Sequence, residues 1–506
     1  MGIIAMSDTG RCVTLATTVS VQNYLFRSNR LSENAGASYL VEEAFKDLGG
    51  KNRGSRIYVG GGGAAFVFPS RSAAVDAIKT WSRDWLIDKA PGLRVAVCHQ
   101  SVERSLRRAY LKAQQQLKQN EDKAPFGAWP GALPVVRECT STGLAAECES
   151  YGSWVSREAL TKRDKAKKSR DQAHDKYFNV LRARTFPEEL EDLGSVEGSS
   201  HIAVVHADGD GIGELFRRTA LNCSDEDDEF FRNQMFSLSE SVKGLEREAF
   251  GATIAELIQY QEAHSEARDV WVRPLVEAGD DLTFVTKGKL GVALTVRYLR
   301  HFRDMSRHWL ADFAETKGQA WSACAGVAIV PGKFPFARAY HLAEQLAGGA
   351  KAKRRELLNA GATGPDACWI DFQPILEASA DTLTKTRDLM YGLAQSQLQR
   401  PYCIAGARDA AYNWQRFEWM WKEFGKWPRS RAKELFEALP RGAAVTDETV
   451  TLASAAGWST PAAQNRPAFL ETSTVSAAEY WDPLEMLDLH EDLAPGRGKT
   501  NAAARD

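Results

Sequence analysis

The chain repeats one order of apolar and amphipathic segments twice. In its first part, short apolar runs typical of strands alternate with segments whose apolar residues recur at helical spacing. The strand candidates are 13–21, 56–59, 64–68 and 93–98, and the helix candidates are 37–48 and 72–87. This β-α-β-β-α-β order predicts a ferredoxin-like domain, with the glycine hairpin Gly60-Gly61-Gly62-Gly63 between its second and third strands.

The second occurrence lies further along the chain. Its strand candidates are 202–205, 270–276, 282–285 and 322–330, and its helical segments are 214–260, 291–316 and 337–347. Pro274 predicts that the second of these strands is irregular or at an edge, because proline cannot donate a hydrogen bond to a neighbouring strand. A repeat of this length predicts a pseudo-dimer of two similar domains.

The segments outside the repeats are helix-prone, and two of them allow alternative interpretations. Residues 161–170 form a charged run that could face RNA, although a solvated helix face is the commoner reason for such a run. Trp414, Phe417, Trp419 and Trp421 could stack on single-stranded bases. Aromatic residues at this density more often form the core of a small helical bundle, which is the interpretation we favour.

Two short acidic motifs carry the chemistry. His206-Ala207-Asp208-Gly209-Asp210-Gly211 follows one apolar run, and Ala278-Gly279-Asp280-Asp281 precedes another. Carboxylates crowded at strand ends repel one another, and a divalent cation removes the repulsion while it binds a phosphate oxygen and a hydroxyl. A helix-loop-helix calcium site is excluded because its twelfth position would be Thr219 rather than Glu. The pair of motifs resembles the metal-binding motifs of a palm domain that polymerises or cyclises nucleotides.

The expected fold class is α+β, with two ferredoxin-like palm domains of the nucleotidyl cyclase type, inter-palm helices and a C-terminal helical domain. In the first palm, the glycine hairpin would offer a nucleotide only a backbone surface. The expected boundaries are 1–130 for the first palm, without metal-binding carboxylates, 131–198 for a helical linker domain, 199–375 for the second palm with its Ala-Gly-Asp-Asp active site, 376–495 for the C-terminal helical domain and 496–506 for a disordered tail.

Composition and charge limit the partners and the cellular compartment that we expect for the protein. The net charge of −2 gives no overall attraction to nucleic acid, so any such binding must use local patches. Because the sequence shows no secretory segment and no apolar run of membrane-spanning length, we expect a cytoplasmic protein without a membrane partner. Eight cysteines without a Cys-x-x-Cys framework fit a reducing compartment. Cys139 and Cys148 are expected to be unligated thiols rather than half of a zinc site.

The motifs resemble those of the large, polymerase/cyclase subunit of type III CRISPR effector complexes, whose two palm domains make cyclic oligoadenylate from ATP. The resemblance covers most of residues 12–375. In the first palm it rests on Val21-Gln22-Asn23-Tyr24-Leu25-Phe26, Gly36-Ala37-Ser38-Tyr39-Leu40 and Tyr58-Val59-Gly60-Gly61-Gly62. In the second palm it rests on 208–213, Gly279-Asp280-Asp281, 325–329, Phe334-Pro335-Phe336 and 342–351, and it is weaker at 427–431 and 482–485.

The resemblance implies two-metal catalysis with Mg²⁺ or Mn²⁺ and with ATP as the substrate. Asp208, Asp280 and Asp281 would be the catalytic residues, and together with the main-chain carbonyl of Gly209 they would hold the two ions. A metal role for Asp210 is left open, because related palms often keep only the first acidic side chain of this motif on the metal. The implied nucleotide-binding residues are Gly211, Ile212, Gly213, Lys351, Gly60, Gly61, Gly62, Gly63 and Ser38.

The sequence departs from the family pattern at three points. The usual Gly-Gly-Asp-Asp is Ala278-Gly279-Asp280-Asp281 here, which is tolerable if Ala278 has an extended backbone. The first palm strand starts near residue 12, and the only His-Asp pair, His174-Asp175, lies between the palms, so we expect no HD nuclease activity. The family's four-cysteine zinc element is absent or reduced to Cys139 and Cys148, so zinc is not expected.

The implied partners are a guide crRNA and a target RNA, reached through a multisubunit antiviral complex, and small effector subunits that dock on the C-terminal helical domain. One alternative is a stand-alone cyclic-nucleotide or oligonucleotide synthetase of a non-CRISPR defence system. Another is a scaffold with an inert palm, which the retained Asp208, Asp280 and Asp281 disfavour, because clustered carboxylates without a cation are costly. Lys351 could also be a solvated lysine with no phosphate to bind.

Overall fold

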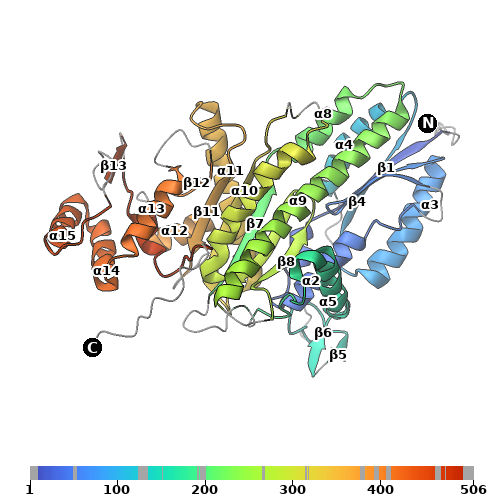
Figure 1. Cartoon of the computed structure of the whole chain (residues 1–506). Coiled ribbons are helices and arrows are strands. Elements are labelled where there is room, and N and C mark those ends of the chain that lie inside the picture. The colour runs from blue at the N-terminus through green and yellow to red at the C-terminus, as the bar shows by residue number, and fades with distance from the viewer. Residues whose placement is uncertain are drawn as a thin grey trace.

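The computed structural model describes residues 10–49, 54–123, 135–150, 152–190, 193, 201–264, 268–313, 316, 318–375, 382–392, 398–405, 412–461, 469–472 and 475–493. Two sheets with their helices lie side by side, and the C-terminal helices extend from the second sheet (Figure 1). The α+β class predicted from the sequence is confirmed. The expected tail, 496–506, lies outside the described residues.

The first sheet has the order β2-β3-β1-β4, and every neighbouring pair in it is antiparallel. Its strands are β1 (Cys12–Thr18), β2 (Ser55–Gly60), β3 (Gly63–Phe68) and β4 (Val95–Ser101). Its helices are α1 (Val21–Leu25), α2 (Leu31–Glu43), α3 (Arg71–Ser82) with the π-helical continuation η1 (Arg83–Lys89), and α4 (Leu106–Lys123). This is the ferredoxin-like strand order that the sequence predicts.

Two predicted boundaries in the first palm are wrong. The strand expected to reach Val21 ends at Thr18, because Ser20 adopts a φ of 52° and turns the chain into α1. The helix expected at 37–48 begins earlier, at Leu31. Element ends depend on such local turns and are the part of a helix or strand that periodicity defines least well.

The second sheet has the order β12-β11-β10-β7-β9-β8, in which only β10 and β11 are parallel. Its strands are β7 (His201–Gly209), β8 (Val272–Glu277), β9 (Asp281–Lys287), β10 (Ala323–Pro331), β11 (Trp369–Pro374) and β12 (Tyr402–Cys403). Its helices are α8 (Ile212–Asn222), α9 (Asp228–His264), the 3-10 turn η2 (Gly288–Leu290), α10 (Gly291–Trp309) and α11 (Phe336–Asn359). As Pro274 predicts, β8 is an edge strand, and its pairing register shifts between Pro274 and Val276.

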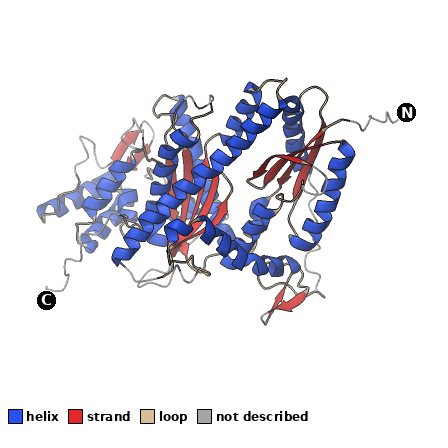
Figure 2. Cartoon of the chain, turned by 45° about the vertical axis from the view of Figure 1, so that its right-hand side comes forward, coloured by secondary structure: helices blue, strands red, loops and turns tan. Residues whose placement is uncertain are grey.

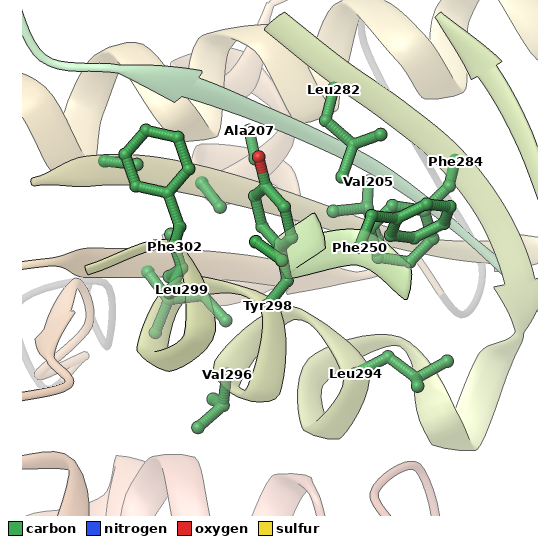
Figure 3. Packing of buried hydrophobic residues seen from close by; sticks show 14 of the residues in the cluster. Val205, Ala207, Phe250, Leu282, Phe284, Leu294, Val296, Tyr298, Leu299 and Phe302 are labelled. Atoms are coloured by element: carbon green, nitrogen blue, oxygen red, sulfur yellow. The ribbon is translucent and has the colours of Figure 1, made fainter. Parts of the chain in front are cut away.

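The second sheet is buried on both faces. Val205 and Ala207 of β7 pack with Phe250 of α9 and with Tyr298 of α10, as Figure 3 shows. On the opposite face, Val204 packs in a cluster that also holds side chains of α11 and of the first sheet. Because one apolar cluster includes residues from both sheets, the two palms share part of their core.

Between the palms lie the hairpin β5 (Cys148–Ser150) and β6 (Ser153–Val155), α5 (Arg157–Lys176) and α6 (Phe178–Leu181), with the hairpin projecting from the molecule (Figure 2). The charged run on α5 is not only a solvated face. Lys162 is fully buried and donates to Glu158 at 2.6 Å, and Arg163 donates to the buried Glu33 at 2.6 Å. The interpretation of a solvated run is therefore wrong for the part of α5 that packs on α2. Cys139 is a free, buried thiol.

The C-terminal part contains α12 (Leu383–Tyr391), α13 (Trp414–Phe424), α14 (Arg429–Ala438), η6 (Leu439–Arg441), α15 (Ala443–Ala455), β13 (Phe469–Thr472), β14 (Val475–Ala478) and α16 (Trp481–Glu485). Trp414 and Phe417 are buried, as expected for core aromatic residues, but they pack on Phe372 and Tyr402 of the second sheet rather than inside a separate bundle. Trp419 is 39% exposed.

None of the helices that the structure describes is long and apolar enough to cross a membrane.

Candidate active site

The two acidic motifs meet at the end of the second sheet. β7 and β9 are antiparallel neighbours, and their register places Asp208 directly opposite Asp281. Directly opposed residues have Cβ atoms about 4.5–5.5 Å apart. The strands are buried up to this point, since Ala207 and Leu282 are fully buried (Figure 3), whereas the side chain of Asp208 is 29% exposed. The carboxylates therefore lie where the core meets solvent.

Main-chain hydrogen bonds hold the turn between β8 and β9 against the end of β7. The N–H of Gly209 donates to the carbonyl of Asp280 at 3.1 Å, and the N–H of Ala278 donates to the carbonyl of Asp281 at 2.9 Å. Gly279 has a φ of +90°, which a side chain would strain. Ala278 is not among the described residues with a positive φ, so alanine in place of the family's first glycine leaves the turn unstrained.

One group in the part of the chain that the structure describes could hold a metal ion. It comprises His206, Asp208 and Asp281, whose ligand atoms all lie within 4.8 Å of one another. The sequence analysis missed His206 as a candidate ligand, although its position two residues before Asp208 places both side chains on one face of β7. Asp280 is not part of this group, but it lies close enough to Asp208 for the two charges to interact.

The electrostatics of the group favour a cation. Burial, and then the negative charge of Asp208, raises the pKa of Asp280 to about 7. Burial, together with the charges of Asp280 and Asp208, raises the pKa of Asp281 well above its usual value. Burial lowers the pKa of His206 to about 4, so its imidazole is neutral at pH 7 and able to act as a ligand. Carboxylate and carbonyl oxygens are the donors that Mg²⁺ and Mn²⁺ prefer, so the residues present fit the expected ions.

Lys351 approaches the same group from α11. Its Nζ donates to the carboxylate of Asp208 and lies 3.5 Å from the carbonyl oxygen of Gly209. Its side chain is only 17% exposed, so the alternative of a solvated lysine is wrong. The lysine therefore offsets negative charge at the carboxylates, and its expected contact with a phosphate stays a prediction.

The side chain of Asp210 contacts residues outside the metal group. Its carboxylate lies 3.3 Å from Nε of Arg354 and accepts a hydrogen bond from the hydroxyl of Ser322 at 2.9 Å. The side chain of Asp210 is only 10% exposed. Because a cation and a hydroxyl already hold this carboxylate, Asp210 serves the attachment of β7 to β10 and α11 rather than the metal group.

The expected triphosphate-binding segment forms the beginning of α8. Gly211 is the N-cap, with a φ of +71°, and Ile212 is the first helical residue. The side chain of Ile212 is buried, so at this residue the main chain is the part that could face a phosphate. The first N–H groups of a helix lack intrahelical acceptors and carry partial positive charge, which suits an anion.

One cavity of about 70 Å³ lies between the two palms. Its lining combines residues expected from both palms with one that was missed: Ser38, Gly61, Gly62, Asp281 and His206. Ligand pockets usually measure about 300–1,000 Å³, so a nucleotide would need the two palms to move apart from this conformation.

The glycine hairpin of the first palm contacts the β8–β9 hairpin of the second palm. We call the latter the acidic hairpin, because it carries Asp280 and Asp281. A Cβ on Gly61, which has a φ of +60°, would lie 3.0 Å from the carbonyl oxygen of Ala278. Gly60 packs against Lys243 of α9, and neither Gly60 nor Gly63 lines the cavity. The structure therefore brings Gly61 and Gly62 to the carboxylates and leaves the outer two glycines beside them.

A second set of side chains supports the acidic hairpin from behind. Glu246 of α9 is buried and accepts a hydrogen bond from the N–H of Gly279 at 2.8 Å. Glu277 pairs with Lys176 at 2.8 Å and accepts a hydrogen bond from the hydroxyl of Tyr177. The sequence analysis assigned no role to these residues. Glu246, Lys176 and Tyr177 come from α9 and from the end of α5, where no local motif joins them to the hairpin, whereas Glu277 ends β8 directly before Ala278.

No family model matches the chain, and no curated protein matches it. Solved structures, by contrast, do match the chain. A Csm1-Csm4 cassette in complex with pppApA has a TM-score of 0.55 at 12% sequence identity, and the match covers 96% of this chain and 70% of that one. Csm1 in T. onnurineus has a TM-score of 0.54 at 13% identity, with 97% and 71% covered. A Csm1-Csm4 cassette in complex with cA4 has a TM-score of 0.51 at 12% identity, with 95% and 70% covered.

The chain has the Csm1 fold. At this low identity the likeness concerns the fold, and it agrees with the resemblance that the sequence motifs show to large subunits of type III CRISPR complexes. These matches cover 96% and 97% of this chain, so they include most of both palms and of the C-terminal helices.

Proposed function

We propose that the chain is a nucleotidyltransferase that makes cyclic oligoadenylate from ATP, as the large subunit of a type III CRISPR antiviral complex. The observation that carries the proposal is the cavity in which Asp281 of the second palm faces Ser38, Gly61 and Gly62 of the first. One palm thus supplies carboxylates and the other supplies a backbone surface. The pppApA and cA4 in the matched Csm1-Csm4 structures support this class of intermediate and product.

In the proposed reaction, Asp208, Asp280, Asp281 and the carbonyl of Gly209 would hold two divalent ions. When bound, the ions would supply a lower pKa for the attacking ribose hydroxyl and charge neutralisation for the triphosphate, from which pyrophosphate would leave as the hydroxyl oxygen bonds to the α-phosphorus. The chain's own residues bind and orient the nucleotides. The first N–H groups of α8 bind phosphate oxygens, and Lys351 places a positive charge beside Asp208.

Glu246 holds the catalytic carboxylates in position for metal binding. Glu246 holds the N–H of Gly279, so the turn that carries Asp280 and Asp281 is tied to α9. A catalytic group that is held in position before the substrate arrives loses less entropy during the reaction. This positioning role belongs to Glu246, because the structure places its carboxylate against the main chain of the turn.

The test is the synthesis of oligoadenylate from ATP in Mg²⁺ or Mn²⁺, by the purified chain and by its complex with co-purified subunits and RNA. We expect mass spectrometry to find oligoadenylate and pyrophosphate with the native protein and none with Asp280→Ala/Asp281→Ala. The control is Asp175→Ala, since the side chain of Asp175 is 85% exposed and lies outside the metal group. Unchanged turnover in the folded double variant would refute the metal assignment. Co-purification of crRNA would separate the CRISPR complex from a stand-alone synthetase.

A further inference from the structure

A larger cavity, of about 300 Å³, lies where α2, α5, β8 and residues 187–189 meet. It shares no lining residue with the cavity between the palms. Its charged lining residues are Arg163, Lys167, Arg170, Arg273, Glu188 and Glu189. The wall therefore carries four cationic and two acidic side chains, contributed by the inter-palm helix, the following segment and the second palm.

Arg273 is the most unusual of these residues. It is only 3% exposed, and neither its Nε nor its Nη1 has a hydrogen-bond acceptor among the described residues. Burial and the nearby charge of Arg170 lower the pKa of Arg273 to about 10, against the opposite effect of Glu277. A buried guanidinium with unpaired N–H groups is costly, and an anion in the cavity would supply the missing acceptors.

The other cations are only partly neutralised. Arg163 donates through Nε to Glu33, but its Nη2 is buried and has no acceptor within the described parts of the chain. Arg170 pairs with the exposed Glu188. Lys167 makes no ion pair with any residue that the structure describes, and its side chain is exposed at the cavity. Two elements that line the cavity, α5 and β8, thus each carry an arginine with an unpaired donor.

We propose that this cavity binds a small phosphate anion, inorganic phosphate or diphosphate, between the arginines and the lysine of α5 and Arg273 of β8. Guanidinium groups match phosphate oxygens with two parallel N–H donors, which makes arginine the preferred residue for such anions. The volume lies at the lower end of the range for ligand pockets, about 300–1,000 Å³. None of the described lining residues is aromatic, so no ring is present on which a nucleotide base would stack.

A bound anion would connect three parts of the molecule. Ser32 of α2 belongs to the first palm, Lys167 and Arg170 belong to α5, and Arg273 belongs to the second palm. A ligand that binds the folded state stabilises it by an amount that grows with the ratio of its concentration to Kd. Phosphate or diphosphate should therefore raise the unfolding midpoint of the whole chain.

The test measures binding of inorganic phosphate and of diphosphate by calorimetry and thermal unfolding, at constant ionic strength and in EDTA. The chelator removes divalent ions, so an anion cannot bind through metal at the palm. We expect saturable binding to the native chain, at least tenfold weaker binding to Lys167→Gln/Arg170→Gln, and unchanged binding to Lys168→Gln. Lys168 is the matched control because it is an exposed neighbour on α5 that does not line the cavity.

Three results would overturn the proposal: no saturable binding by the native chain, equal affinity of the double variant and the native chain, or binding of AMP or ATP that is tighter than that of diphosphate and that Lys167→Gln/Arg170→Gln weakens. The first two would remove the site, and the third would assign it to a nucleotide. Asp280→Ala/Asp281→Ala should keep the affinity for diphosphate, because neither residue lines this cavity. The outcome is therefore independent of whether the palm makes oligoadenylate.

Discussion

Replacement of Gly61 by valine tests whether the glycine hairpin acts through its close approach to the second palm. Gly61 has a φ of +60°, and a Cβ there would lie 3.0 Å from the carbonyl oxygen of Ala278. Ala278 directly precedes the turn that carries Asp280 and Asp281. A valine side chain would therefore press on the segment that positions the carboxylates.

Two separate costs follow from this geometry. A left-handed backbone conformation costs any L-residue about 1–2 kcal/mol, and this lowers the free energy of unfolding. The contact with Ala278 requires the acidic hairpin to move by a few tenths of an ångström for the Cβ alone, and the two methyl groups of valine require more. A displacement of about 1 Å in a catalytic site can lower the rate about 10²-fold, so we expect Gly61→Val to reduce oligoadenylate synthesis about 10- to 100-fold.

Gly143→Val is the matched control. Gly143 has a φ of +67°, and a Cβ there would meet no described atom within 4 Å, so the variant carries the backbone cost without the contact. Thermal unfolding should show a similar loss of stability in both variants, while mass spectrometry should show loss of product only in Gly61→Val. Equal activity in the two variants, whether both are active or both are inactive, would refute the reasoning.

Three further predictions address other parts of the chain. Lys351→Met should lower ATP turnover at least tenfold, because the ammonium contacts Asp208, whereas Lys353→Met on the same helix should not; equal turnover would contradict the role. Lys162→Met should lower the free energy of unfolding by about 3 kcal/mol in denaturant titration, because it leaves a buried carboxylate without this partner; an unchanged midpoint would show that the pair is dispensable. Single-stranded DNA should stay intact in Mn²⁺, Ni²⁺ or Co²⁺, and cleavage that disappears in His174→Ala would contradict this.

The architecture of the palms could be predicted because local patterns determine it. Apolar runs give the strands, Pro274 gives the edge position of β8, and the ferredoxin-like order follows from the succession of elements. The facing of Asp208 and Asp281 also follows, because each acidic motif stands at the end of an apolar run in adjacent strands.

Residues whose role depends on distant elements could not be predicted in the same way. Glu246 reaches the acidic hairpin from the middle of α9, where its neighbours show only helical periodicity. Lys162 is buried because Glu158 and the carbonyl of Tyr24 accept its N–H groups, and no local pattern distinguishes it from the solvated lysines around it. Trp414 joins the core of the second sheet because β12, which precedes it, pairs with β11.

The hydrogen bonds of the two hairpins show how the palms correspond residue by residue. In the second palm, the N–H of Gly209 at the end of β7 donates to the carbonyl of Asp280 at 3.1 Å. In the first palm, the N–H of Thr18 at the end of β1 donates to the carbonyl of Gly62 at 2.8 Å. Gly62 therefore occupies the place of Asp280, and Thr18 that of Gly209.

The strand registers extend this correspondence to the other carboxylates. β1 pairs Thr17 with Gly63, as β7 pairs Asp208 with Asp281. All three acidic positions of the second palm are thus threonine or glycine in the first, on the same backbone framework. The hydroxyl of Thr17 is neutral, and Gly62 and Gly63 have no side chain. The first palm therefore lacks the clustered negative charge that a divalent cation would offset. At the positions of the three carboxylates, the palms therefore differ in side chains on a shared hairpin framework, which leaves the second palm as the half that can hold metal while the first offers its main chain.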